Sequence, residues 1–129
     1  MVEVTIRGKR FPLCLTVAAL DKVNARCGGL KQLTEHLDGG GEGTTIARNT
    51  TWMLALLIRG GEDNRLMEAK LAGETLEPRQ VPDEEMLSGL LGFADIVGYR
   101  KDVFAAINES LTQSIEASHS KNAGNAEQG

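Results

Sequence analysis

The sequence predicts a mainly α-helical protein, built as a small multi-helix domain with an N-terminal β-hairpin. The first fifteen residues contain two short stretches in which apolar residues alternate with others, the period of a half-buried β-strand. Beyond them the apolar residues recur every three or four positions, as on one face of a helix. Glycine-rich breaks divide this helical pattern into several segments.

The chain has 129 residues, a length typical of one domain with one hydrophobic core. Apolar residues make up 41% of it and charged residues 25%, which is the balance of a globular protein. We expect a single domain over 1–117. The remaining stretch, 118–129, has no apolar periodicity and is predicted to be a disordered tail.

Residues 2–15 form the predicted hairpin. A type II′ turn with Gly8 and Lys9 at its centre would place all the alternating apolar side chains on one face. This register pairs three apolar couples, Ile6 with Phe11, Val4 with Leu13 and Val2 with Leu15. It also sets Arg7 opposite Arg10, a like-charge pair, so a longer loop over 7–10 is the alternative. Because an isolated two-stranded hairpin is marginal in water, the helices that follow are expected to cover its apolar face.

The first helix has clear end signals. Thr16 is a suitable N-cap, and Gly28 with Gly29 ends the helix. The predicted buried face has helical spacing and consists of Val17, Leu20, Val23, Asn24 and Cys27. A second short helix carries a stripe of Leu30, Leu33 and Leu37, and the glycine-rich stretch 38–43 ends it.

The most apolar segment is TWMLALLI at 51–58, which predicts the central, most buried helix. Thr44 or Thr45 is expected to cap this helix. RGGED at 59–63 predicts a turn after it. A weaker helical pattern and a polar connector follow, and the sequence leaves open whether 62–80 is helix or loop.

Two more helices are predicted towards the C-terminus. Pro82 suits the first turn of one of them, where the dipole favours the carboxylates of Asp83, Glu84 and Glu85. Its apolar face consists of Met86, Leu87, Leu90 and Leu91. Gly92 interrupts the pattern, and the last helix carries a stripe of Ile96, Tyr99, Val103, Ile107, Leu111 and Ile115, flanked by Phe93, Val97 and Phe104. RKD at 100–102 is expected on its solvated face.

Charge and hydropathy exclude several classes of protein. A net charge of −4 and an isoelectric point near 5.2 argue against a nucleic-acid-binding protein, because such proteins present a concentrated basic face. The longest apolar run, 52–58, is far shorter than the roughly 20 residues that span a bilayer. No apolar run near the start resembles a signal peptide, so we expect a soluble, cytoplasmic protein with no membrane partner. Cys14 and Cys27 are expected to be reduced.

No motif predicts an enzyme, a metal site or a cofactor. DGGGEGTT at 38–45 resembles a phosphate loop but lacks the lysine that the Walker pattern requires. His36 and His119 have no ligand or catalytic partner at a suitable spacing. The start of a helix already explains the carboxylates of PDEE at 82–85. Trp52 is either a core residue or, as the only tryptophan, an interface anchor.

The order of these segments resembles the tail assembly chaperones of long-tailed bacteriophages and related prophage or gene-transfer elements. Members open with a hairpin of the form I-x-I-x-G-K-x-[FY]-x-L-x-[FL], matched by VTIRGKRFPLCL at 4–15. GGLKQLTEHL at 28–37, LALLIRGG at 54–61 and PDEEML at 82–87 match later motifs of the family. The resemblance covers roughly residues 2–111. It departs from the family at Asp21, which is followed by Lys22, and in a longer polar stretch from Leu66 to Gln80.

The resemblance implies a protein that coats and solubilises the helix-rich tape measure protein, in the cytoplasm of the bacterial host, until tail tube subunits replace the coat. It also implies self-association into rings or helical assemblies, absence from the mature virion and, in many members, a longer frameshifted form. The candidate interaction residues are the polar residues of the hairpin, Trp52 and one tyrosine of the last helix: Glu3, Thr5, Arg7, Lys9, Arg10, Trp52 and Tyr99.

Two other functions stay open at this point. One is a minor tail or virion structural protein with the same order of hairpin and helices. The other is a small regulatory or antitoxin-like module that binds nucleic acid or a partner protein, although the acidic isoelectric point argues against nucleic acid.

Overall fold

The computed structural model describes the backbone of residues 1–128 and the side chains of residues 1–112. This part of the chain is mainly helical and begins with a two-stranded antiparallel sheet, as predicted. Its elements are β1 (Glu3–Ile6), β2 (Lys9–Pro12), α1 (Val17–Cys27), α2 (Leu30–Asp38), the short 3₁₀ helix η1 (Gly39–Gly41), α3 (Gly43–Leu71), α4 (Glu84–Leu90) and α5 (Phe93–Gln128). The predicted tail, 118–129, lies outside the residues whose side chains are described, so its disorder stays a prediction.

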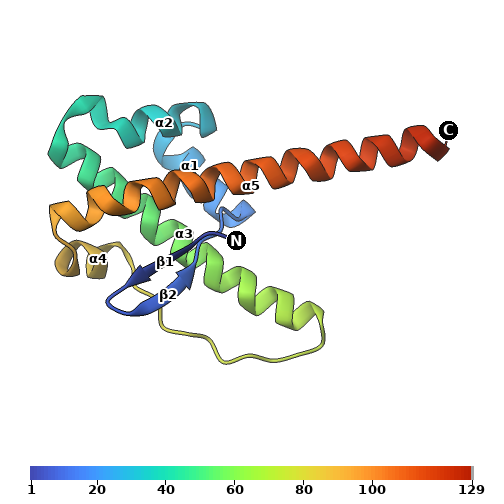
Figure 1. The fold of residues 1–129 in the computed structure, drawn as a ribbon, viewed down its shortest axis with the longest axis horizontal. Coiled ribbons are helices and arrows are strands. Elements are labelled where there is room, and N and C mark those ends of the chain that lie inside the picture. The colour runs from blue at the N-terminus through green and yellow to red at the C-terminus, as the bar shows by residue number, and fades with distance from the viewer. Residues whose placement is uncertain (129) are drawn as a thin grey trace.

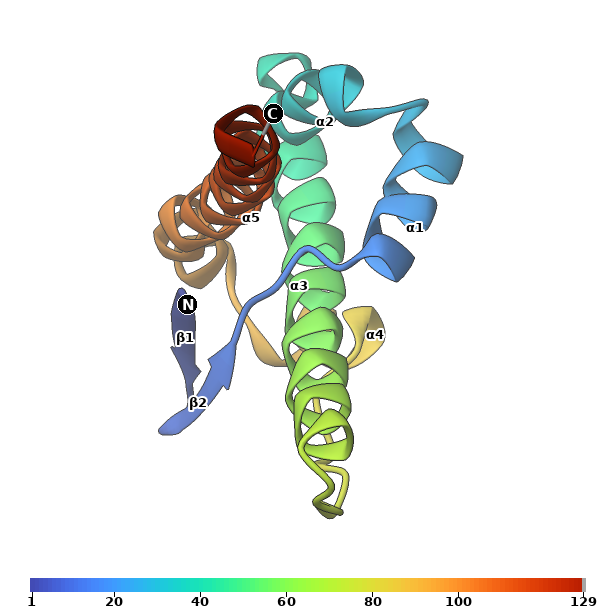
Figure 2. The same cartoon turned by 90° about the vertical axis from the view of Figure 1, so that its right-hand side faces the viewer.

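The helix α3 forms the centre of the molecule (Figures 1 and 2). The hairpin and α5 lie on one side of it, α1 lies on the other, and α2 lies at its N-terminal end (Figure 2). The core consists of the apolar faces of these elements, with Val23, Leu37, Met53, Leu54, Leu57, Leu87 and Val103 fully buried. None of the helices in the described part of the chain has both the length and the apolar character needed to cross a membrane.

The hairpin turn differs from the predicted one. Its central residues are Arg7 (φ 50°) and Gly8 (φ 82°), the signs of a type I′ turn, whose twist matches that of the paired strands. Val4 therefore pairs with Phe11 instead of Leu13. This change of partner by two positions keeps every apolar side chain on the same face, because side chains alternate with a period of two. The predicted opposition of Arg7 and Arg10 is absent, since Arg10 pairs with Thr5.

The caps of the first helices are partly as predicted. Thr16 accepts a hydrogen bond from the Ala19 N–H at 3.1 Å, and Gly28 ends α1 in the left-handed conformation. Only Ala19 and Val23 of α1 are fully buried, whereas Val17 at its start is 78% exposed. The prediction of a threonine cap on α3 is wrong, because Glu42 is the N-cap.

The predicted turn at 59–63 does not exist, since α3 continues through it to Leu71. The segment that leaves β2 crosses α3 at this point (Figure 2). A methyl group on Gly61 would lie 1.8 Å from the Pro12 carbonyl oxygen, and one on Gly60 would lie 2.1 Å from that of Cys14. The two glycines therefore lie within a helix and allow the backbone of the segment after β2 to pack directly against it. The open question of 62–80 is answered by helix to Leu71 and an irregular connector after it.

Helices α4 and α5 also correct details of the prediction. Asp83 is the N-cap of α4, so Pro82 precedes the helix instead of lying in its first turn. Of the predicted apolar face of α4, only Leu87 is fully buried. Arg100 is not simply solvated, because its guanidinium donates to the Leu37 carbonyl at 2.7 Å and to Thr50 Oγ1 at 3.1 Å.

Candidate interaction surface at the hairpin and α5

Three of the predicted interaction residues come together in the structure. Glu3, Thr5 and Tyr99 line an open recess of about 510 Å³ between β1 and the first turns of α5. The rest of its lining consists of Val4, Ala94, Asp95, Gly98, Lys101 and Asp102. We call this area the hairpin–α5 surface.

The backbone edge of β1 faces this recess. Leu13 N–H donates to the Val2 carbonyl at 2.8 Å, so the alternation of an antiparallel ladder turns the polar groups of residues 3 and 5 outwards. The Tyr99 hydroxyl donates to the Thr5 carbonyl at 2.8 Å. Burial raises the pKa of this hydroxyl, which therefore keeps its proton and remains a donor. The Thr5 carbonyl, on the edge of β1 that faces away from β2, thus has a hydrogen-bond partner within the molecule.

Arg7 joins the tip of the hairpin to the corner between α4 and α5. Its guanidinium donates to the Leu90 carbonyl at 3.0 Å and lies 3.7 Å from the Asp95 carboxylate. Both side chains of this ion pair are substantially exposed, so the pair contributes little to stability. Its effect is to hold the turn against the start of α5.

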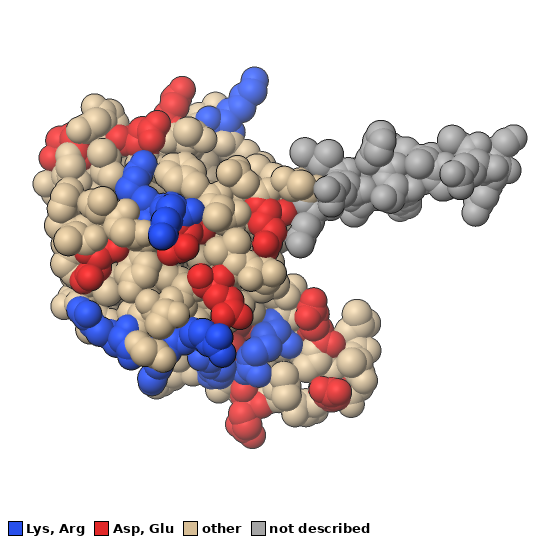
Figure 3. Space-filling model, viewed as in Figure 1, with Lys and Arg blue, Asp and Glu red and all other residues tan. Residues whose placement is uncertain are grey.

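Lys9 and Arg10 lie on the other strand and are exposed. Within the described part of the chain, neither side chain makes an ion pair or a hydrogen bond. Figure 3 shows that lysine and arginine side chains gather over the hairpin and the neighbouring connector. The hairpin thus presents positive charge on a protein whose net charge is −4.

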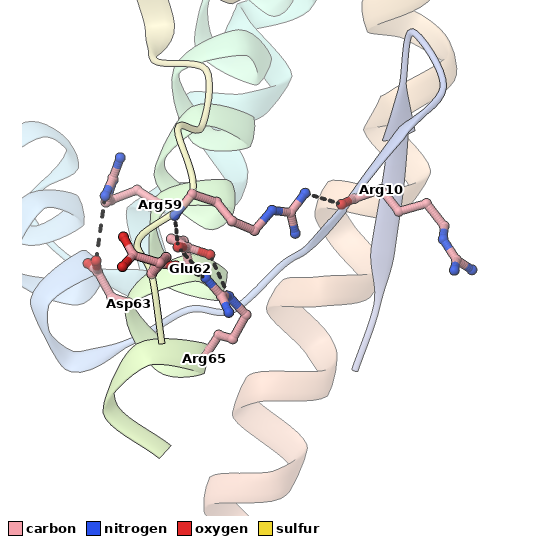
Figure 4. A network of polar contacts seen from close by, with 7 residues as sticks. Arg10, Arg59, Glu62, Asp63 and Arg65 are labelled. Atoms are coloured by element: carbon pink, nitrogen blue, oxygen red, sulfur yellow. Dashed lines mark hydrogen bonds and ion pairs between the residues drawn. The ribbon is translucent and has the colours of Figure 1, made fainter. Parts of the chain in front are cut away.

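A buried carboxylate fixes the connector beside β2 (Figure 4). Glu62, 2% exposed, accepts two hydrogen bonds at 2.9 Å from the Arg65 guanidinium and one at 2.6 Å from the Arg79 N–H. The Arg65 guanidinium, through these hydrogen bonds, lowers the pKa of the Glu62 carboxyl. Arg79 in turn donates to the Arg10 carbonyl at 3.1 Å and covers the Phe11 ring. The free edge of β2 is therefore held by the connector.

Two apolar side chains of α5 lie outside the lining of this recess and were assigned by the sequence to the flanks of the core stripe. In the structure Phe93 is 60% exposed and Val97 is 49% exposed. They are four positions apart and so share one side of α5, and Phe93 lines a separate recess with Thr44, Ala47 and Ile96. In the sequence, the sign of their exposure was that they lie beside the apolar stripe of the last helix and not on it. Neighbouring exposed apolar residues of this kind often mark a site of interaction.

Trp52 lies apart from the other predicted residues, on the α1 and α4 side of α3. Its ring is half-buried, with the edge of His36 at 5.5 Å and the Arg26 guanidinium 4.5 Å from its centre. It is thus neither a fully buried core residue nor part of the hairpin–α5 surface.

The glycine-rich stretch before α3 is not a free anion site. The Glu42 carboxylate accepts from the N–H groups of Thr44 and Thr45 and from the Thr45 hydroxyl, at 2.6–3.0 Å. These hydrogen bonds, led by that of the Thr45 hydroxyl, lower the pKa of Glu42 to about 2. The carboxylate therefore occupies the positions that a bound phosphate would need.

Metal and histidine chemistry gain no support from the geometry. In the part of the chain that the structure describes, no group of three or more histidine, cysteine or acidic side chains could hold a metal ion. His36 Nε2 is buried without a hydrogen-bond partner beside Trp52, and His119 lies outside the residues whose side chains are described. Comparisons with protein-family models, with curated proteins and with solved structures found no match to this chain.

Proposed function

We propose that this protein is a tail assembly chaperone of the bacteriophage type, which binds helical segments of a tape measure protein and keeps them soluble. The observation that carries the proposal is the exposure of two apolar side chains, Phe93 and Val97, on one side of α5. The order of motifs in the sequence supports the same proposal. On this proposal the protein acts in the cytoplasm of the bacterial host and is absent from the mature virion.

The surface suits an amphipathic helix. A helix of a client protein would place its apolar face on Phe93 and Val97 and its polar flank on Lys101, which is exposed one turn after Val97. The apolar contact is small, because it consists of two side chains. Binding would therefore be reversible, as required of a coat that tail tube subunits later displace.

Self-association is the second part of the proposal. Lys9 and Arg10 have no intramolecular charge partners in the described part of the chain, and the molecule as a whole is acidic. Contacts between the basic hairpin of one copy and an acidic face of the next would be heterologous. Such contacts extend into rings or helical assemblies, depending on whether the rotation closes.

The proposed binding of a client helix to α5 is tested by replacing valine with aspartate at two positions, one within the proposed contact and one far from it. Val97→Asp places a carboxylate on the proposed surface, whereas Val17→Asp places one at the exposed start of α1. Affinity for a soluble tape measure fragment from the same genome is measured by titration calorimetry, and the complexes are sized by chromatography with light scattering. We expect Val97→Asp to weaken binding at least tenfold, because burying a valine contributes roughly 1.5–3 kcal/mol and tenfold is about 1.4 kcal/mol.

Val17→Asp should bind the fragment like the wild type and should show the same circular dichroism as Val97→Asp. Equal binding by both variants would contradict the proposed surface, and no binding by the wild type would contradict the function. Mass spectrometry of purified phage particles separates the chaperone from a virion structural protein, because a chaperone should be missing from the particles.

A further inference from the structure

A second recess lies against α1, α3 and the start of α4. Helices α1 and α4 are on the opposite side of α3 from the hairpin and α5 (Figure 2). The recess has a volume of about 290 Å³ and is formed by α1, the middle of α3 and the chain that enters α4. Its lining consists of Lys22, Trp52, Ala55, Leu56, Arg59, Pro82, Asp83 and Glu84. We call it the Trp52 recess. It shares no residue with the hairpin–α5 surface.

The floor of the Trp52 recess is apolar and held in place. Ala55 and Leu56 are each 8% exposed, and Pro82 is buried. Trp52 is fixed by the edge of His36 and by the Arg26 guanidinium, which lies 4.5 Å from the ring centre. Arg26 also lies 4.0 Å from the Glu84 carboxylate at the rim. A partner would therefore meet an indole that is already oriented, at little cost in side-chain entropy.

The charged side chains around the recess differ in whether they have a partner within the molecule. The Asp83 carboxylate accepts from the Met86 N–H at 2.8 Å, and Glu84 faces Arg26. Lys22 makes no ion pair or hydrogen bond within the described residues. Arg59 has only Asp63, at 3.7 Å, in a pair that is about half exposed. Lys22 is therefore the one charged side chain of the rim that has no partner among the described residues.

We propose that the Trp52 recess docks an acidic amphipathic helix of a partner protein. An apolar side chain of that helix packs on Trp52 and Leu56, and a carboxylate four positions away reaches Lys22 and Arg59. Residues four apart lie on the same face of a helix, so one turn supplies both contacts. The unpaired lysine beside an apolar floor favours this occupant over a basic or neutral helix. This interaction goes beyond the proposed chaperone function, because it uses a different face of the molecule.

The only tryptophan of the sequence is itself the reporter of binding. The probes are alanine-rich helical peptides of about 16 residues, long enough to be helical in water. One carries leucine and glutamate four positions apart, the second has lysine in place of glutamate, and the third has alanine in place of leucine. Each is titrated into the full-length protein while tryptophan emission is recorded, with calorimetry as an independent measure. The leucine–glutamate peptide should shift the emission and saturate, and it should bind better than either other peptide.

Charge reversal on the protein provides the matched test. Lys22→Glu should weaken the leucine–glutamate peptide about two- to fivefold, the range of an exposed ion pair, and should strengthen the leucine–lysine peptide. Lys31→Glu makes the same change at an exposed position on α2 outside the recess and should leave both affinities unchanged. Added salt should reduce the preference for the acidic peptide.

Three outcomes would overturn the proposal. One is the absence of saturable binding by the leucine–glutamate peptide. Another is equal binding of the acidic and basic peptides, or an equal effect of Lys22→Glu and Lys31→Glu. The third is an emission shift that depends on protein concentration alone, which would make a second copy of this chain the occupant of the recess.

Discussion

Glu62 shows how one residue can connect distant parts of the chain. Its carboxylate is buried in α3, yet it accepts hydrogen bonds from Arg65 and from the backbone of Arg79. Arg79 then reaches the hairpin through the Arg10 carbonyl. A buried charge is tolerated only when it is paired and hydrogen-bonded, and Glu62 meets both conditions. Losing the charge should therefore loosen the connector as well as α3.

Glu62→Gln should lower the free energy of unfolding at pH 7 by about 1.5–3 kcal/mol, the range for hydrogen bonds to a charged group. The pKa of Glu62 is lower in the folded state than its usual value of 4.5. Its stabilising contribution is therefore present above that value and is lost as the pH falls towards the folded-state pKa. The difference between wild type and Glu62→Gln should shrink below about pH 4.5, as measured by urea unfolding at several pH values.

The control for this experiment is Glu68→Gln, which changes an exposed carboxyl of the same helix. It should alter the free energy of unfolding by no more than about 0.5 kcal/mol. A difference for Glu62→Gln that stays constant from pH 7 to pH 3 would refute the assigned role of the charge.

Among the elements, α3 is longer than its sequence predicts, because it continues through the glycine pair Gly60 and Gly61. Glycine pairs ordinarily predict a turn, and RGGED contains one. Here the helix continues through both glycines, and the segment after β2 passes so close that no side chain would fit at Gly60 or Gly61. The Cys14 N–H donates to the Leu57 carbonyl at 3.1 Å in the same crossing. The glycines weaken the helix locally and permit the packing that stabilises it.

Gly61→Ala should destabilise the protein by about 2 kcal/mol or more, although alanine favours a helix by about 1 kcal/mol over glycine. The added methyl group would overlap the Pro12 carbonyl, so the hairpin or α3 must move. Gly98→Ala is the matched control, because nothing lies within 4 Å of a methyl group added there in α5. It should raise the melting temperature, whereas Gly61→Ala should lower it. Thermal unfolding followed by circular dichroism measures both, and similar shifts for the two variants would contradict the close crossing.

At the scale of the whole molecule, the N-terminal segment is held between α3 and α5. The Val2 N–H donates to the Glu109 carboxylate and the Leu15 N–H to the Ser110 hydroxyl, both at 3.2 Å. Each contact joins residues about a hundred positions apart. The hairpin is thus part of the core and at the same time displays its polar side chains to solvent. One face of the hairpin therefore stabilises the fold, and its other face is available for contacts with other molecules.

Val4→Asp should unfold the protein, because Val4 is 2% exposed and a carboxylate there would be buried without a partner. Glu3→Lys, at the neighbouring exposed position, should leave the protein folded. It should nevertheless change self-association, since it reverses a charge on the hairpin, the element through which copies are proposed to associate. Circular dichroism measures folding and analytical ultracentrifugation measures assembly. A folded Val4→Asp, or unchanged assembly of Glu3→Lys over a wide concentration range, would disprove the corresponding half of this prediction.

Local patterns in the sequence determined the fold class, the presence of the hairpin and both ends of α1. Thr16, Gly28 and the acidic start of α4 act on groups within a few residues of themselves, so neighbouring sequence is sufficient to predict them. The gathering of Glu3, Thr5 and Tyr99 was only partly foreseen. They were named as interaction residues, but the sequence also placed Trp52 with them, and it lies on the other side of α3.

Only the tertiary structure decided the continuation of α3, the burial of Glu62, the role of Arg100 and the exposure of Phe93 and Val97. Each of these depends on a segment remote in sequence, such as the strand exit that crosses Gly61 or the connector that meets Glu62. Periodicity and capping report the preferences of a few neighbouring residues. Whether a given face becomes core or surface is settled by which distant segment packs against it.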